Sequence, residues 1–224
     1  MRNAIAIILF FSAPAFGSNG YLFGGTPVAS VGGGSNTDTF VDANGTALAT
    51  HNANWVDTGG SNGNVAYCQI QSNTLQATSG FAGCIAMYNT SVSDASSLIV
   101  PANSDSSTSK QPCVRAGNGA GSDRTGYCAQ LETISGSNWT DVHGAKNGGF
   151  FDDKTVSVLV ASDHTLKITA SGTSTVTITY YVDGVNVGTS SDSSSPLAAS
   201  HPGFKVQDNG TASFTNTGTW TDAP

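Results

Sequence analysis

Three polar residues with complementary chemistry fall within one stretch that is typical of a β-hairpin. Two segments of strand-like composition, joined by a Gly-rich segment, predict this hairpin over residues 113–133. If Cys113 lies opposite Cys128, the alternation of side chains places three polar residues on one solvent-facing surface, namely Arg115, Gln130 and Glu132. A cation, an amide and a carboxylate there are suited to hydrogen bonding with sugar hydroxyls. We therefore predict that these three side chains contact a glycan.

A second polar surface is predicted from residues 174–190. Apolar residues alternate with threonines over residues 176–182, which indicates a half-buried strand. Asp183-Gly184 then provides the two positive-φ residues of a type I′ turn, so the chain returns as an antiparallel strand. Tyr181 and Asn186 lie on the hydroxyl-rich side of this hairpin, and we predict that they also contact sugar.

Catalytic alternatives have less support. A glycosidase needs two carboxylates across a cleft, but the chain contains a single Glu, and the consecutive Asp152 and Asp153 point to opposite faces of a strand. A polysaccharide lyase needs only a base and a group that neutralises a uronate; Arg115, Gln130 and Glu132 meet part of this requirement, with His143 or Tyr88 as a candidate base. The Gly-x-Ser-x-Gly motif of serine hydrolases is absent from the sequence.

The composition favours an all-β protein and excludes one class of partner. Gly contributes 27 of the 224 residues, helix-forming residues are scarce, and the segment from residue 38 to the end contains no linker, so one domain is expected. The net charge is −7, with only 8 scattered Lys and Arg residues. Binding to nucleic acid requires clustered basic residues, and we therefore predict no nucleic-acid partner.

The first 37 residues are predicted to act in export and assembly. Residues 1–17 combine an early Arg, an apolar run and an Ala-x-Ala sequence, which is typical of a secretory signal peptide. Residues 18–37 form a Gly-rich arm that still carries apolar side chains, so residues 18–36 are a candidate for self-association by strand addition. The expected location is secreted or on the extracellular surface, with no membrane span.

Four cysteines are expected to form two disulfides. An even number of cysteines in an exported chain, without a Cys-x-x-Cys motif, favours disulfides over a metal site. Three pairings are possible. The predicted strands favour Cys68 with Cys84 and Cys113 with Cys128, because each pair then falls on neighbouring strands.

Several short motifs follow one another over about residues 38–222. They are Asp38-x-Phe40, Gly45-Thr-Ala-Leu48 and Trp55, Ile70-Gln-Ser-Asn-Thr-Leu75, Gly126-Tyr-Cys-Ala-Gln-Leu131, Tyr181-Val-Asp-Gly-Val-Asn-Val187, Asp192-Ser-Ser and His201-Pro-Gly-Phe204. Their order resembles that of concanavalin A-like, laminin-G-like jelly-roll domains of secreted bacterial and phage proteins.

This resemblance implies a two-sheet antiparallel jelly-roll sandwich over residues 38–224 with one concave sheet, and a polysaccharide or cell-surface glycan as the partner. No cofactor is expected; the resemblance leaves a structural Ca²⁺ as the alternative, for which Asp38 and Asp42 are candidate ligands, although Asp in such a sequence context is usually turn chemistry. Trp55 and Trp139 are expected to pack in the core of such a fold rather than to stack on sugar.

The predicted function is therefore that of a secreted, non-catalytic glycan-binding module. The first alternative is a structural subunit of an extracellular fibre or virion surface, assembled through the N-terminal arm. The second alternative is a polysaccharide lyase.

Overall fold

A computed structural model describes residues 35–59, 65–78, 83–90, 93–104, 109–118, 124–207 and 218–222. The predicted signal peptide and most of the predicted arm lie outside these residues. At the end of the arm, the Asn36 amide donates to Asp222 at 2.6 Å, and Thr37 pairs with Thr221. The predictions for residues 1–34 remain predictions.

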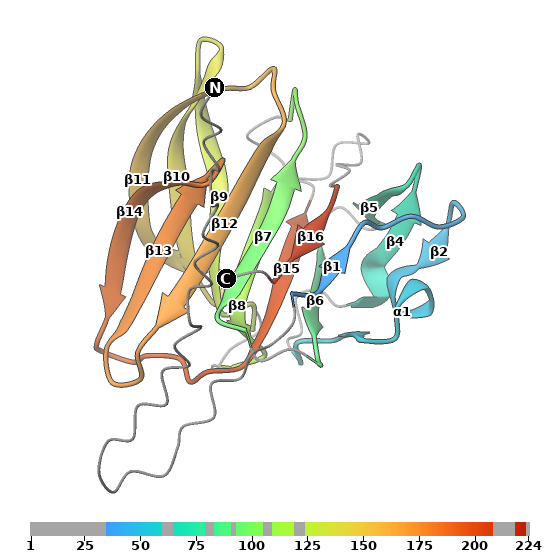
Figure 1. Cartoon of the computed structure of the whole chain (residues 1–224), viewed down its shortest axis with the longest axis horizontal. Coiled ribbons are helices and arrows are strands. Elements are labelled where there is room, and N and C mark those ends of the chain that lie inside the picture. The colour runs from blue at the N-terminus through green and yellow to red at the C-terminus, as the bar shows by residue number, and fades with distance from the viewer. Residues whose placement is uncertain are drawn as a thin grey trace, which may run out of the picture. The chain divides into compact units, whose positions relative to one another are not determined.

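The described residues form two large antiparallel sheets (Figure 1). The first has six strands, in the order β1 (Thr37–Asp38), β16 (Trp220–Thr221), β7 (Ala95–Val100), β12 (His164–Ser171), β13 (Val176–Val182) and β14 (Val185–Asp192). The second has seven strands, in the order β11 (Gly149–Leu159), β10 (Asn138–Lys146), β9 (Tyr127–Ser135), β8 (Ser109–Ala116), β15 (His201–Gln207), β6 (Cys84–Tyr88) and β3 (Trp55–Val56). The predicted all-β antiparallel sandwich is confirmed.

A small third sheet lies at one end of the molecule, together with the short helix (Figure 1). Its strands are β2 (Thr46–Ala47), β4 (Cys68–Gln71) and β5 (Thr74–Ala77). The helix α1 is Leu48–His51, and the 3₁₀ helix η1 is Val65–Tyr67. Among the described residues, no helix is long and apolar enough to span a membrane.

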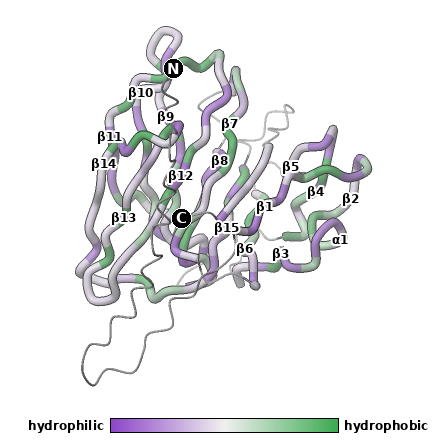
Figure 2. The backbone as a smooth tube through the Cα atoms, viewed as in Figure 1, coloured by the Kyte–Doolittle hydropathy of each residue, from purple (hydrophilic) through white to green (hydrophobic). Residues whose placement is uncertain are grey.

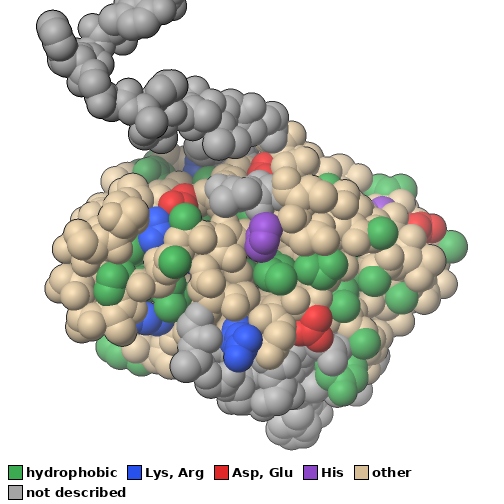
Figure 3. All heavy atoms as spheres, turned by 90° about the horizontal axis from the view of Figure 1, so that it is seen from below, with side chains coloured by type: hydrophobic (Ala, Val, Ile, Leu, Met, Phe, Trp, Pro, Cys, Tyr) green, Lys and Arg blue, Asp and Glu red, His purple; other side chains and the backbone are tan. Residues whose placement is uncertain are grey.

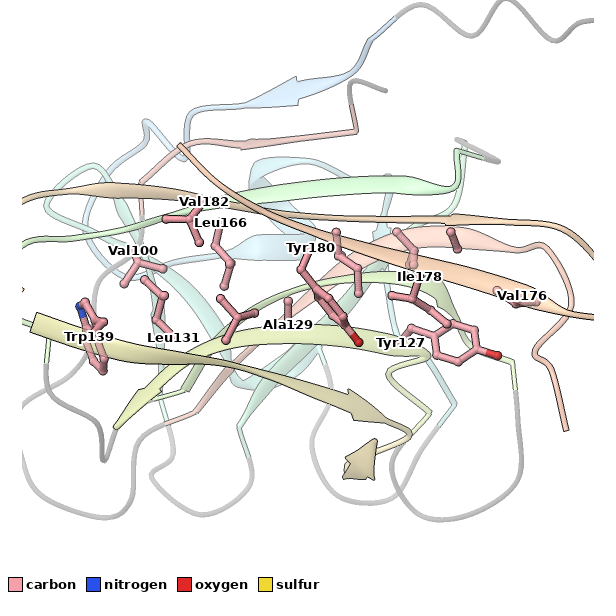
Figure 4. Close-up of a cluster of buried hydrophobic side chains, with 14 of the residues drawn as sticks. Val100, Tyr127, Ala129, Leu131, Trp139, Leu166, Val176, Ile178, Tyr180 and Val182 are labelled. Atoms are coloured by element: carbon pink, nitrogen blue, oxygen red, sulfur yellow. The ribbon is translucent and has the colours of Figure 1, made fainter. Parts of the chain in front are cut away.

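The core lies between the two large sheets. Apolar side chains from β9 and β10 face those of β12 and β13 across the interface, as Figure 4 shows for Leu131, Trp139, Leu166, Ile178 and Tyr180. Hydrophilic and hydrophobic residues follow one another along these strands (Figure 2), as expected when only one side of each sheet is buried. Polar residues between the buried ones therefore belong to the two outer faces.

The predicted turn at Asp183-Gly184 is present. Asp183 and Gly184 have φ values of 52° and 79°, and Val182 pairs with Val185 across the turn. A bulge follows, because Tyr181 pairs with Asn186 whereas Tyr180 pairs with Gly188. Val187 packs against the core, as expected from its place after the turn.

Both predicted disulfides are present. Cys68 is bonded to Cys84, which ties β4 to β6, and Cys113 is bonded to Cys128, which joins two paired positions of β8 and β9. The sulfur atoms of the second bridge lie on the outer face of the seven-stranded sheet, where the buried Ala145 packs against them.

A second core cluster fills the end near the third sheet. Trp55 and Trp220 pack edge to face with ring centroids 4.6 Å apart, and Phe204 and Tyr88 pack around them. Trp55, Trp139, Trp220 and Tyr88 are all buried. The expectation that Trp55 and Trp139 pack inward is therefore confirmed.

The edge strands β11 and β14 meet at one side of the sandwich. Lys154 of β11 extends over Gly188 of β14 and forms an ion pair with Asp152. A Cβ atom at Gly188 would lie 2.6 Å from Cδ of Lys154, so a larger residue there would displace the lysine stem from this position. A lysine ammonium thus lies over the gap between the two edges.

Candidate functional site

Arg115 does not lie on the outer face, contrary to the prediction. Its side chain is 1% exposed and forms two hydrogen bonds with the carboxylate of Asp94, at 2.9 and 2.7 Å. It also donates to the carbonyl oxygens of Gly172 and Leu197, at 2.9 and 2.6 Å. The guanidinium thus forms its hydrogen bonds with loops that connect the strands.

The backbone of Arg115 explains why the alternation argument failed. Its φ is 57°, in the left-handed region that few residues other than glycine adopt. It coincides with an irregularity in the pairing of β8 with β15, where His201 pairs with Ala116 but Gly203 pairs with Cys113, so the regular alternation of faces does not hold at Arg115. We therefore withdraw Arg115 as a surface residue and assign it to anchoring the loops.

Tyr181 and Asn186 lie together on the outer face of the six-stranded sheet. They pair across β13 and β14, and Lys167 of β12 pairs with Tyr181 on its other side. The Lys167 ammonium is 5.6 Å from the centre of the Tyr181 ring, which is within range of a cation–π interaction. These two predicted contact residues are thus on a different sheet from Gln130 and Glu132.

Gln130 and Glu132 lie on the outer face of the seven-stranded sheet, as predicted. Gln130 pairs with His143 of β10, which in turn pairs with Asp153 of β11. Lys205 of β15 pairs with Gln111 of β8, and the Gln111 amide donates to Oε1 of Gln130 at 2.7 Å. Side chains from five neighbouring strands therefore form one polar row across the sheet.

The amide of Gln130 has capacity left for a ligand. Both of its hydrogen bonds among the described residues go to Oε1, from Gln111 at 2.7 Å and from Ser109 at 3.1 Å. The Nε2 group of this half-buried side chain is therefore a donor without a protein partner among those residues. Two neighbouring residues hold the donor in a fixed orientation.

His143 lies at the centre of the row and is held by two carboxylates. Its Nδ1 atom is 3.1 Å from Oε2 of Glu132 and 3.0 Å from Oδ1 of Asp153. The two contacts fix the ring and place a proton on Nδ1. The structure shows no bond from the described residues to Nε2, so this atom is open to a ligand.

An apolar row runs beside the polar row. Its members pair in succession across the strands, and they are Val56, Met87, Gly203, Cys113, Cys128, Ala145 and Phe150. At the end of the row, Phe150 is 68% exposed, and its ring centre is 5.3 Å from that of His143. An exposed aromatic ring thus adjoins two nitrogen atoms, Nε2 of Gln130 and Nε2 of His143, that have no hydrogen-bond partner among the described residues. We call Gln130, Glu132, His143, Phe150 and Asp153 the outer patch.

Only part of the outer patch is predicted from the sequence, namely Gln130 and Glu132 as sugar contacts and His143 as a candidate base. Asp153 is predicted only to point away from Asp152, and no prediction concerns Phe150. The signal that was available is Asn147-Gly148, which has φ values of 47° and 75° and joins β10 to β11 as a two-residue hairpin.

The set of residues required for a lyase is not assembled. Arg115 is buried at the loops, and Tyr88 is 8% exposed within the aromatic cluster. Only Gln130, Glu132 and His143 of the predicted set lie close together. The cation expected to neutralise a uronate is therefore missing from this group.

Asp38 and Asp42 are already engaged with protein donors. The Asp38 carboxylate accepts hydrogen bonds from the Phe40 amide at 2.8 Å and from the Trp55 indole at 2.7 Å. The His51 ring bridges it to Asp42, at 2.9 and 3.2 Å. Among the described residues, no group of three or more His, Cys, Asp or Glu side chains is arranged to hold a metal ion. Calcium binding stays a prediction.

Charged side chains are sparse on the surface. On the face that Figure 3 shows, acidic and basic side chains occur as separate spots within a largely uncharged surface. A ligand at the outer patch would therefore interact with the side chains of the patch itself rather than with a wider charged surface.

The fold is that of a concanavalin A-like jelly-roll sandwich. A beta-glucanase from Bacillus licheniformis has a TM-score of 0.52 and 14% sequence identity, over 85% of this chain and 97% of that one. A structure described as a native glycosidic hydrolase has a TM-score of 0.50 and 10% identity, over 84% and 94% of the two chains. No family model and no curated protein matches the sequence. At such low identity the likeness establishes the fold alone.

Proposed function

We propose that this protein is a secreted, non-catalytic glycan-binding module and that the outer patch contacts the sugar. The observation that carries the proposal is the exposed ring of Phe150 beside His143, whose Nδ1 is fixed by two carboxylates. Sugars present both C–H faces and hydroxyl edges. An aromatic ring packs against the C–H faces, and amides, carboxylates and imidazoles form hydrogen bonds with the hydroxyl groups.

The arrangement of the patch supports this proposal further. Its polar groups come from three adjacent strands, so the sheet backbone holds them in place without a ligand, and little ordering is needed on binding. The two disulfides are consistent with an extracellular environment. The name of the Bacillus licheniformis neighbour, a beta-glucanase, associates the shared fold with a glycan.

A glycan array followed by calorimetry tests the proposal. We expect saturable binding to at least one neutral polysaccharide, and Phe150→Ala should weaken it about tenfold, which corresponds to roughly 1.4 kcal/mol. The matched control is Leu159→Ala, because Leu159 is also an exposed apolar residue of β11, at 55%. The absence of binding on a broad glycan array, or equal losses of affinity in Phe150→Ala and Leu159→Ala, would contradict the proposal.

One observation favours a second candidate, glycoside hydrolysis. The carboxylates of Glu132 and Asp153 lie 3.1 and 3.0 Å from Nδ1 of His143, so their nearest oxygens are at most about 6 Å apart, a limit compatible with the roughly 5–5.5 Å of retaining glycosidases. Asp153 supplies the second carboxylate, and the single Glu of the chain is therefore no obstacle.

Release of reducing ends from the polysaccharides that bind on the array distinguishes the two candidates. Hydrolysis predicts turnover that is lost at least a hundredfold in both Glu132→Gln and Asp153→Asn. Binding without turnover in the wild-type protein assigns the patch to recognition alone.

A further inference from the structure

Three buried polar atoms lack a hydrogen-bond partner, and all three lie at one end of the seven-stranded sheet. They are Oγ1 of Thr58, Nε of Arg124 and Oγ1 of Thr125, and they are the only such atoms in the described part of the chain. Thr58 is 3% exposed and Thr125 is 1% exposed. An unpaired polar atom at such depth costs about 1–3 kcal/mol, so several in one place call for an explanation.

Short contacts bring the three residues together. Thr58 follows β3 and Thr125 precedes β9. The Gly117 amide donates to the carbonyl of Arg124 at 2.8 Å, and a Cβ atom at Gly117 would lie 3.8 Å from the Thr58 carbonyl. Nη1 of Arg124 lies 3.4 Å from the Cβ position of Gly59, the residue after Thr58. Both ends of the β8–β9 connection thus lie beside the segment that follows β3, next to the Arg124 side chain.

Arg124 also lacks a counter-charge in the described residues. The ion pairs found there use Arg115, Lys146, Lys154 and three histidines, but not Arg124. The carboxylate of Asp57, the residue before Thr58, accepts the Gly59 amide at 2.7 Å. Nε of Arg124 and two hydroxyls are therefore donors without a protein acceptor.

We propose that Thr58, Arg124 and Thr125 form a binding site for a carboxylate or an oxyanion of similar size. Arginine donors and hydroxyls are the groups that bind such anions in proteins. The site adjoins the apolar row, because Gly117 packs against Met87. It therefore suits either a free carboxylate or the carboxylate of a uronic acid, and it is independent of the outer patch.

The Nε–Hε signal of Arg124 in a ¹H–¹⁵N spectrum is a direct probe of the site. Sodium acetate, sodium glucuronate and glucose are titrated separately into the full-length protein at constant ionic strength. We expect saturable movement of this signal with acetate and glucuronate and none with glucose. Tighter binding of glucuronate than of acetate would identify a sugar-linked carboxylate as the ligand, and equal binding would identify a free carboxylate.

Isosteric variants separate binding from structure. Thr58→Val and Thr125→Val remove only the hydroxyls, and each should weaken anion binding at least tenfold while the melting temperature stays equal or rises. The controls are Thr165→Val and Lys167→Gln, on the other sheet, which should bind as the wild type does. Arg124→Lys keeps the charge but loses the Nε donor, and we expect weaker binding there too.

Two results would overturn the proposal. One is a signal that moves only in proportion to salt with every probe. The other is undiminished anion binding in both valine variants, which would show that the hydroxyls are merely unpaired.

Discussion

The two outer faces of the sandwich share the same pleat and carry different chemistry. On the six-stranded sheet, Thr169, Thr179 and Thr189 pair in one row, and Ser171, Thr177 and Ser191 pair in the next. Threonine is a good strand former, so solubility and propensity account for these threonines. On the seven-stranded sheet, the outer patch includes Asp and Glu, which strands disfavour. Because strand propensity does not account for Asp and Glu at these positions, their presence requires another reason, and ligand binding is such a reason.

The largest expected effect is a loss of stability at Arg115, which belongs to neither outer face. Asp94→Ala leaves the buried guanidinium without its carboxylate and should lower the free energy of unfolding by about 3 kcal/mol, measured by urea denaturation. Asp163→Ala is the control, because this carboxylate accepts only the Ala102 amide at an exposed position, and it should cost under about 1.5 kcal/mol. Loss of glycan binding in Asp94→Ala with stability unchanged would instead return Arg115 to the outer surface.

The next effect tests whether the two faces differ in binding. Tyr181→Ala removes an aromatic ring from the six-stranded sheet, as Phe150→Ala does from the seven-stranded one. We expect the first variant to keep the wild-type affinity within about twofold and the second to lose about 1.4 kcal/mol, both by calorimetry. The reverse order would transfer the proposed site to Tyr181 and Asn186.

The two hairpin turns give a matched pair of substitutions. Gly148 and Gly184 have φ values of 75° and 79°, and alanine in this region costs about 1 kcal/mol or slightly more at either turn. Thermal unfolding should show equal losses for Gly148→Ala and Gly184→Ala. Only the first should also weaken glycan binding, because Gly148 lies two residues before Phe150. Equal binding in the two variants would mean that the turn does not position Phe150.

The smallest effect is a pH dependence that arises outside both faces. Burial opposes protonation of His51, but Asp38 and Asp42 outweigh it and raise its pKa above the usual value near 6.5. The protonated ring therefore stabilises the fold fully below that value, and the contribution is lost as pH rises through the raised pKa. Urea midpoints between pH 5 and 9 should decline over this window in the wild type and less in His51→Gln. Parallel curves would contradict the assignment.

The parts of the fold that sequence predicted are those with local signals. Asp183-Gly184 marks its own turn, and neighbouring strands made Cys113 and Cys128 natural partners. Strand β10 was missed because a bulge between Trp139 and Asp141 breaks its alternation. Placing Asp153 beside Glu132 requires the register of three strands, which no local pattern encodes. Arg115 was misplaced because one residue with positive φ reverses the face of a side chain, and its identity gives no warning of that.

The lysine that spans the gap between β11 and β14 bears on how copies of this protein meet. A strand from a neighbour that docked against either edge would have to strip water from that ammonium or displace it from Asp152. Extension of either sheet by strands from other copies of the protein is therefore unfavourable at the β11 and β14 edges. If the protein builds filaments, they must nucleate elsewhere, and replacing Lys154 with a neutral residue would remove a safeguard against aggregation.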